Sequence, residues 1–190
     1  MANTTHDIPA VATGNATKGP LLCRKETSCQ NPTTTSSDLT AEHPTVLQFF
    51  DSIRDNDGET VRTLLSNDRR LTTLRVRGDY KYDRGVELQA FKCLGAYIGA
   101  LTGLQLAILL GHTGVALDIL DITLNQDLDF YFGDCNSSLH LAVLLGDADV
   151  TRALLERGVN RNLKNGRGFT AVDLASHSDI SALLSSMPQL

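Results

Sequence analysis

Short apolar runs at helical spacing follow one another along the chain from about Val46 onward, separated by Gly, Asn and Asp. This punctuation is typical of helix ends rather than of alternating strands. The clearest unit has two such helical faces, each followed by a glycine: Leu139, Ala142, Val143 and Gly146, then Val150, Ala153, Leu154 and Gly158. Neither helix exceeds about ten residues, and isolated helices shorter than roughly 12–15 residues are marginal in water. The pattern therefore predicts helix pairs that are stable only when packed on neighbouring pairs.

One pattern occurs twice: SSLHLA at 137–142 is followed thirty-three residues later by TAVDLA at 170–175. A fixed period of this length is typical of stacked helical repeats. The first copy, with Gly146 and Gly158 behind it, resembles the ankyrin repeat, whose motif T-P-L-H-x-A recurs at a period near 33. The resemblance implies an all-α, ankyrin-like helical repeat solenoid with short hairpin loops, which binds another protein and is not an enzyme.

The same motif slots are filled at 102–107, and Phe49 to Leu65 resembles a first, capping repeat. We expect a repeat domain over residues 45–190, with repeats at about 46–66, 100–132, 135–165 and 168–187. Gln105 and Asp173 replace the motif histidine, so only the third repeat has the pairing of Ser137 with His140 at its helix start. We expect the outer repeats to be looser.

The stretch at about 67–99 is longer than an ordinary hairpin by about twenty residues, and long ordered insertions are often functional. It contains a helical pattern at 86–92, and tyrosines alternate with its basic residues. The basic residues are Arg69, Arg70, Arg75, Arg77, Lys81 and Arg84. We expect the insertion to contact a partner protein through Arg77, Tyr80, Tyr82 and Arg84.

The aromatic run Phe130-Tyr131-Phe132 falls on a predicted hairpin. At least one of these rings must point inward, whereas Phe130 and Phe132, if they point outward, are candidate anchors for a partner. With Arg167 from the basic final third of the chain, they complete the predicted partner-binding residues.

The net charge of -5 argues against nucleic-acid binding by bulk electrostatics. Charge is also segregated, because residues 93–151 contain seven Asp and no Lys or Arg. Acidic residues within the insertion, such as Asp79 and Asp83, weaken its positive field. We therefore expect the partner to be a protein, bound by an adaptor or regulatory subunit.

Residues 93–117 are twenty-five uncharged positions in which Gly95, Gly99 and Gly103 are spaced as in paired membrane helices. A membrane-anchored protein is therefore one alternative, although Gln105, the glycines and the repeat register argue against it. Another alternative is a fragment of a larger repeat scaffold.

Candidate chemistry has structural explanations in this sequence. His140 occupies the motif histidine position and His112 follows a motif glycine, so we expect no catalytic site, metal or cofactor. Residues 1–44 are rich in Thr, Ser, Asn and Pro, which predicts a disordered tail. Their first twenty residues lack the basic start and apolar run of a signal peptide. We expect a cytoplasmic or nuclear location rather than secretion.

Overall fold

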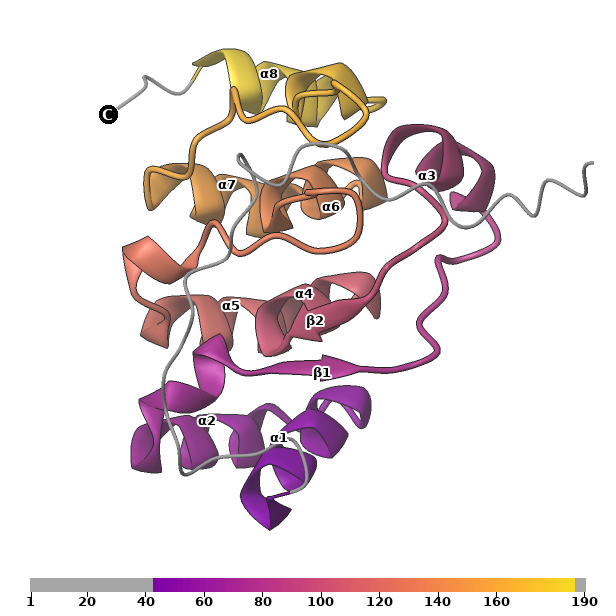
Figure 1. Ribbon diagram of the computed structural model, residues 1–190. Helices are drawn as coiled ribbons and strands as arrows, with labels where there is room; N and C mark the ends of the chain where they lie inside the picture. The colour runs from indigo at the N-terminus through magenta and orange to yellow at the C-terminus, as the bar shows by residue number, and fades with distance from the viewer. Residues whose placement is uncertain (1–42, 187–190) are drawn as a thin grey trace, which may run out of the picture.

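The computed structural model describes residues 43–186, which form four helix pairs stacked one on another (Figure 1). The pairs are α1 (Pro44–Arg54) with α2 (Gly58–Asn67), α4 (Gly103–Leu109) with α5 (Thr113–Ile122), α6 (Ser138–Leu145) with α7 (Ala148–Glu156), and the 3-10 turn η3 (Val172–Leu174) with α8 (Ser178–Ser186). First helices contact first helices along the stack, and second helices contact second helices. This two-layered arrangement confirms the predicted ankyrin-like helical repeat fold.

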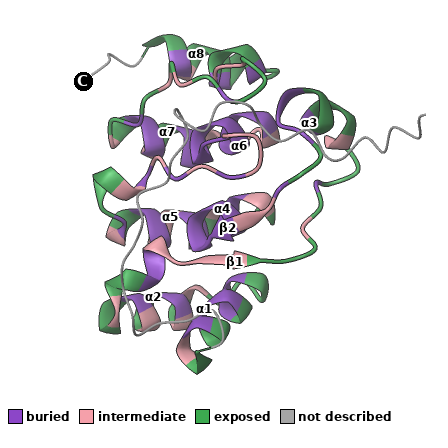
Figure 2. Ribbon diagram, viewed as in Figure 1, coloured by how far each residue is buried: buried purple, intermediate pink, exposed green. Residues whose placement is uncertain are grey.

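A continuous core runs between the two helix layers (Figure 2). Close packing between neighbouring pairs depends on small residues at their contacts. A Cβ atom at Gly103 would lie 2.7 Å from the ring of Phe49, so glycine lets α4 begin directly against α1. Each pair thereby covers the apolar face that its neighbour exposes.

Residues 93–117 do not form one helix. The segment passes from the end of α3 (Glu87–Cys93) through β2 (Ala100–Thr102) into α4, and the chain then turns at Gly111, whose φ is 72°, into α5. Within the part of the chain described here, no helix is long and apolar enough to cross a membrane. The alternative of a membrane span at 93–117 is therefore wrong, because the segment is divided between several elements and most of its apolar side chains pack inside the repeats.

The insertion adds a small sheet to this helical fold. After η1 (Arg69–Thr73), strand β1 (Arg75–Arg77) pairs antiparallel with β2, with Val76 opposite Leu101. The chain then reaches α3, which confirms the helical pattern predicted at 86–92. Figure 1 shows α3 beside α6, so a segment that follows the first pair in sequence lies against the third.

Helix starts outside the third repeat are better bonded than the sequence indicated. In the third repeat, His140 Nδ1 lies 2.8 Å from Ser137 Oγ, and His140 Nε2 lies 3.0 Å from the Phe169 carbonyl. Gln105 occupies the same position at the start of α4 in the second repeat. Its Oε1 accepts from Thr102 N at 3.1 Å, and its Nε2 donates to the Phe130 carbonyl at 2.6 Å. An amide therefore replaces the imidazole, and the helix start of the second repeat is bonded without the motif histidine.

The predicted tail, residues 1–44, lies outside the described residues except for His43 and Pro44. His43 caps α1, because its Nδ1 accepts from Thr45 N at 3.3 Å.

Candidate protein-interaction surface

The insertion is fixed to the repeats at the C-terminal end of α3. The last carbonyls of a helix have no partner within that helix. Here Asn136 Nδ2 donates to the Leu94 carbonyl at 2.8 Å, and Asn165 Nδ2 donates to the Cys93 carbonyl at 2.8 Å. Arg167 Nη1 reaches the Lys92 carbonyl at 3.3 Å. Three side chains from two later hairpin loops therefore cap α3.

Asn165 holds both its own loop and the insertion. Its Oδ1 accepts from the backbone N–H groups of Arg167 at 3.1 Å and Phe169 at 3.0 Å, which shapes the hairpin before η3. Its Nδ2 also donates to Asn136 Oδ1 at 2.9 Å. Both asparagine side chains are buried, so their hydrogen bonds are shielded from water.

Three of the aromatic rings expected to be available to a partner are buried instead. Tyr82, Phe130 and Phe132 are 5%, 3% and 2% exposed. The insertion covers the loop that carries the two phenylalanines, since Arg75 Nη2 donates to the Tyr131 carbonyl at 2.8 Å. The expectation that Phe130 and Phe132 point outward is therefore wrong.

Tyr82 packs within the insertion, where its ring meets Phe91 edge-on at 6.2 Å between centroids. Burial raises its pKa to about 12. The buried hydroxyl forms no hydrogen bond to any residue of 43–186. Tyr80 is half-buried, and its hydroxyl donates to the Val76 carbonyl at 3.2 Å. Neither tyrosine presents a free ring, so the tyrosines that the sequence singled out are structural in this fold.

The three predicted arginines are all exposed but lie in different settings. Arg167 pairs with Asp134 at 3.1 Å as well as capping α3. Arg84 is solvent-exposed on the segment before α3. Arg77, at the end of β1, lines two neighbouring hollows. Contact of these residues with a partner stays a prediction, and Arg77 is the one placed beside a concave surface.

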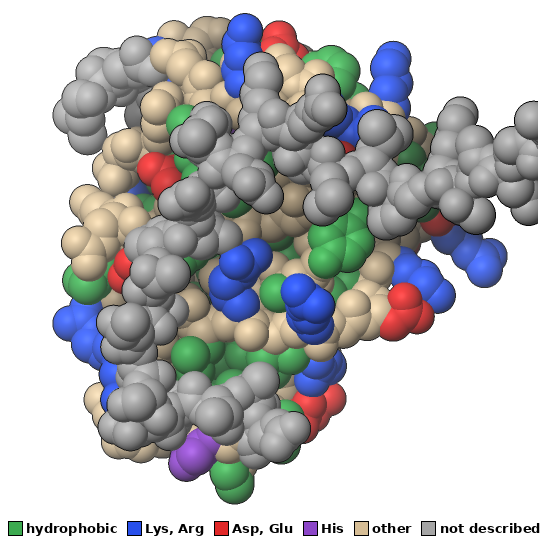
Figure 3. All heavy atoms as spheres, viewed as in Figure 1, with side chains coloured by type: hydrophobic (Ala, Val, Ile, Leu, Met, Phe, Trp, Pro, Cys, Tyr) green, Lys and Arg blue, Asp and Glu red, His purple; other side chains and the backbone are tan. Residues whose placement is uncertain are grey.

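We call the two cavities the first and second hollow; their volumes are ≈ 200 Å³ and ≈ 340 Å³. They share Arg77, Tyr97 and Gly99, so they form one continuous strip, and the Tyr97 side chain between them is 62% exposed. Besides the shared residues, the first hollow is lined by Arg75, Ala100, Tyr131, Phe132, Gly133 and Cys135, and the second by Gly78, Asp79, Tyr80, Ala96 and Ile98. In the space-filling view, Lys and Arg side chains gather over the region of β1 and β2 (Figure 3).

The first hollow has uncompensated positive charge. Arg75 is half-buried and fixed by its Nη2 bonds to the carbonyls of Ala100 at 2.9 Å and Tyr131. Burial lowers the pKa of Arg75, and the nearby charge of Arg77 lowers it further. No carboxylate in residues 43–186 forms an ion pair with either arginine. The strip therefore favours a ligand with negative charge.

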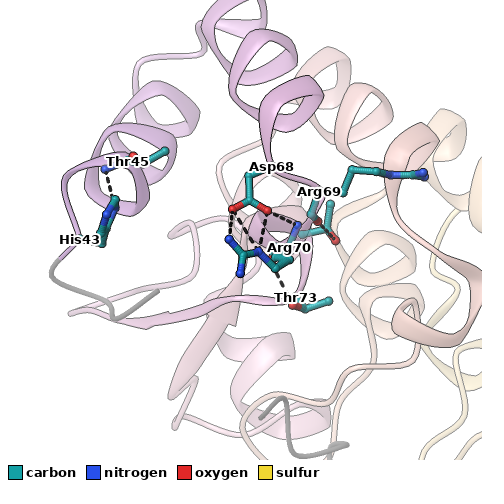
Figure 4. A network of polar contacts seen from close by, with 7 residues as sticks. His43, Thr45, Asp68, Arg69, Arg70 and Thr73 are labelled. Carbon is teal, nitrogen blue, oxygen red and sulfur yellow. Dashed lines mark hydrogen bonds and ion pairs between the residues drawn. The ribbon is translucent and has the colours of Figure 1, made fainter. Parts of the chain in front are cut away.

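Other basic residues of the insertion form hydrogen bonds and an ion pair within the protein (Figure 4). Asp68 accepts from Arg70 N at 3.0 Å, caps η1 and pairs with Arg70 Nη2 at 2.9 Å, and these hydrogen bonds hold the pKa of Asp68 below its usual value. Arg69 Nη2 donates to the Ile122 carbonyl at 3.0 Å. These side chains attach η1 to the first two helix pairs and are separate from the strip.

Sequence reasoning missed Tyr97 and did not separate Arg75 from the other basic residues. Tyr97 lies between Gly95 and Gly99, which both have positive φ. A single tyrosine among small residues in a loop rich in glycine was a signal for an exposed ring. Arg75 and Arg77, two apart on β1, had no such signal until the strand was known.

Comparison with known proteins gives a family match around the third helix pair. Residues 134–166 match a family model described as ankyrin repeat, and this match spans α6, α7 and the flanking loop segments. No curated protein matches the chain. Residues 134–166 are thus an ankyrin repeat, and they lie inside a stack of ankyrin-like helix pairs.

Proposed function

We propose that this chain is a non-catalytic adaptor or regulatory subunit that binds another protein in the cytoplasm or nucleus. An ankyrin repeat is in general a protein-interaction module, which supports this class of function. The observation that carries the proposal is the strip around Tyr97 and Arg77. Tyrosine and arginine are enriched among residues that dominate interface energetics, and here both are exposed beside a concave surface.

Rigid attachment of the insertion also supports binding at this strip. The β1–β2 pairing holds one end of the insertion, and the caps from Asn136 and Asn165 hold the other. Ordering a loop at an interface costs free energy that otherwise contributes to affinity. A strip that is already fixed avoids much of that cost.

Affinity capture with the full chain tests the proposal. The double variant Arg77→Ala, Tyr97→Ala removes both exposed side chains. Arg152→Ala is the control, because Arg152 is an exposed residue of α7 that pairs with Asp149 at 3.4 Å, away from the strip. We expect the wild type and the control to retain a partner that the double variant loses, with melting temperatures unchanged. Equal capture by all three proteins would contradict an interaction at this strip.

The hypothesis that the chain is a fragment of a larger repeat scaffold stays a prediction. Light scattering over a range of protein concentrations tests it, since exposed repeat ends should associate as concentration rises.

A further inference from the structure

We propose that the first hollow binds an acidic group on an extended peptide segment, with its carboxylate or phosphate seated beside Arg75 and Arg77. This inference rests on the proposed function and names the chemistry of the partner. It also gives the segment a direction, because the two hollows differ in charge.

The charge argument begins with strand geometry. Residues two apart on a strand project from the same face, so Arg75 and Arg77 lie together on one side of β1. Arg75 is fixed by two backbone carbonyls, whereas Arg77 is exposed and its guanidinium makes no ion pair within residues 43–186. Two like charges in a partly buried site repel, and an anion between them relieves that repulsion. Arginine also binds carboxylates and phosphates through two parallel hydrogen bonds.

The shape of the strip fits an extended chain better than a single ion. Gly99 and Gly133 line the first hollow. Both have a positive φ, a conformation that favours glycine, so neither position contributes a side chain that would fill the hollow. Tyr97 lines both hollows, and its exposed ring can contact a neutral or apolar residue.

The second hollow differs from the first in charge. Asp79, which pairs with Lys81 at 3.4 Å, lines the second hollow, and no carboxylate from residues 43–186 lines the first. The acidic group therefore belongs over the first hollow, and a neutral residue belongs over the second.

Nucleic acid fits this site less well than a peptide. Affinity for nucleic acid depends on neutralising several phosphates along a strand. Arg75 lies at one end of the strip, Arg77 in the part that both hollows share, and Asp79 at the other end, so a long polyanion would meet repulsion beside Asp79. A single acidic position followed by a neutral one matches this charge pattern.

Fluorescence anisotropy with the full chain tests the proposal directly. The probes are fluorescein-labelled decapeptides of Gly and Leu that contain two adjacent glutamates, two glutamines, or one phosphoserine at the same place, together with a labelled ten-nucleotide thymidine strand. We expect both acidic peptides to bind at least about tenfold more tightly than the glutamine peptide, with affinity falling as salt rises. The glutamate and phosphoserine probes show which anion the hollow prefers.

The variant Arg77→Glu should weaken binding of the acidic peptides by about tenfold or more, because it replaces attraction by repulsion at the site. Arg152→Glu makes the same change in net charge on α7 and should alter binding by less than about twofold, since exposed charges that far apart are screened by salt. Melting temperatures of both variants report whether the fold is intact.

Three results would overturn the inference: equal binding of the glutamate and glutamine peptides, equal loss in the two arginine variants, or preferred binding of the thymidine strand. Failure here is distinguishable from failure of the proposed function. If the peptides fail while the Arg77→Ala, Tyr97→Ala protein still loses its captured partner, the strip binds protein through chemistry other than an anion.

Discussion

Replacing Asn165 by aspartate should release α3 from the repeats while leaving the last hairpin largely intact. The retained oxygen can still accept the backbone N–H groups of Arg167 and Phe169. The amide nitrogen, which donates to the Cys93 carbonyl and to Asn136 Oδ1, becomes an oxygen that cannot donate. The substitution therefore removes two hydrogen bonds and places oxygen against oxygen at both contacts.

The expected cost is about 2–6 kcal/mol of unfolding free energy, because the substitution leaves two buried acceptors unsatisfied and each costs about 1–3 kcal/mol. Domains of this kind have a total stability of about 5–15 kcal/mol. The loss is therefore a large and measurable fraction of the total stability.

Urea unfolding followed by circular dichroism measures the global cost, and hydrogen exchange of the α3 amides shows where it falls. We expect exchange in α3 to accelerate more than exchange in α7. Asn162→Asp is the matched control, because Asn162 is an exposed residue of the same loop. A loss below about 0.5 kcal/mol for Asn165→Asp, or an equal loss for Asn162→Asp, would refute the role assigned to the amide, since surface substitutions usually stay within that range.

Three further substitutions test other contacts. Burial lowers the pKa of His140 below 6.5, so the unfolded chain binds a proton more readily, and the stability of the protein should fall as pH drops below about 6.5. In His140→Gln, with the amide bonded as in Gln105, the urea midpoint should lose this part of its pH dependence. An identical pH dependence in variant and wild type would contradict the prediction. Tyr82→Phe removes a buried hydroxyl that has no hydrogen-bond partner among residues 43–186, and the substitution should stabilise the protein by about 1 kcal/mol. It should also remove a loss of stability between pH 10 and about 12, where the unfolded tyrosine ionises first, and an unchanged alkaline profile would count against this. Arg157 donates to the carbonyls of Leu120 and Thr123 at the end of α5, so Arg157→Lys should lower the unfolding free energy, measured by thermal unfolding, by about 1–2 kcal/mol. Equal stability would show that the several donors of the guanidinium are dispensable.

The helix pairs could be predicted from the sequence because their spacing is local. The period that relates Ser137 to Thr170 sets where each helix starts, and glycines such as Gly146 end the helices. Gln105 shows the limit of motif comparison, since a glutamine amide offers one donor and one acceptor just as a neutral imidazole does. A motif that names only histidine hides this equivalence.

The candidate surface was harder to predict because it depends on contacts between distant residues. Phe130 and Phe132 are buried, and Arg75 donates to the carbonyl of the residue between them, a contact that nothing in the aromatic run itself indicates. The hydrogen bond from Asn136 to the Leu94 carbonyl, which fixes the chain shortly before Tyr97, likewise joins residues that are far apart in sequence. Sequence reasoning located the insertion but not the way it folds back.

The caps on α3 have a consequence for the order in which the protein matures. Cys93 and Asn165 are 72 positions apart, and Leu94 and Asn136 are 42 apart. During synthesis, at roughly 5–20 residues per second, the α3 segment leaves the ribosome seconds before the loops that hold it. The last carbonyls of α3 stay hydrated in that interval, and α3 can be capped only when the later hairpin loops have been synthesised. Formation of these capping hydrogen bonds is then a late folding event that joins the first half of the chain to the second.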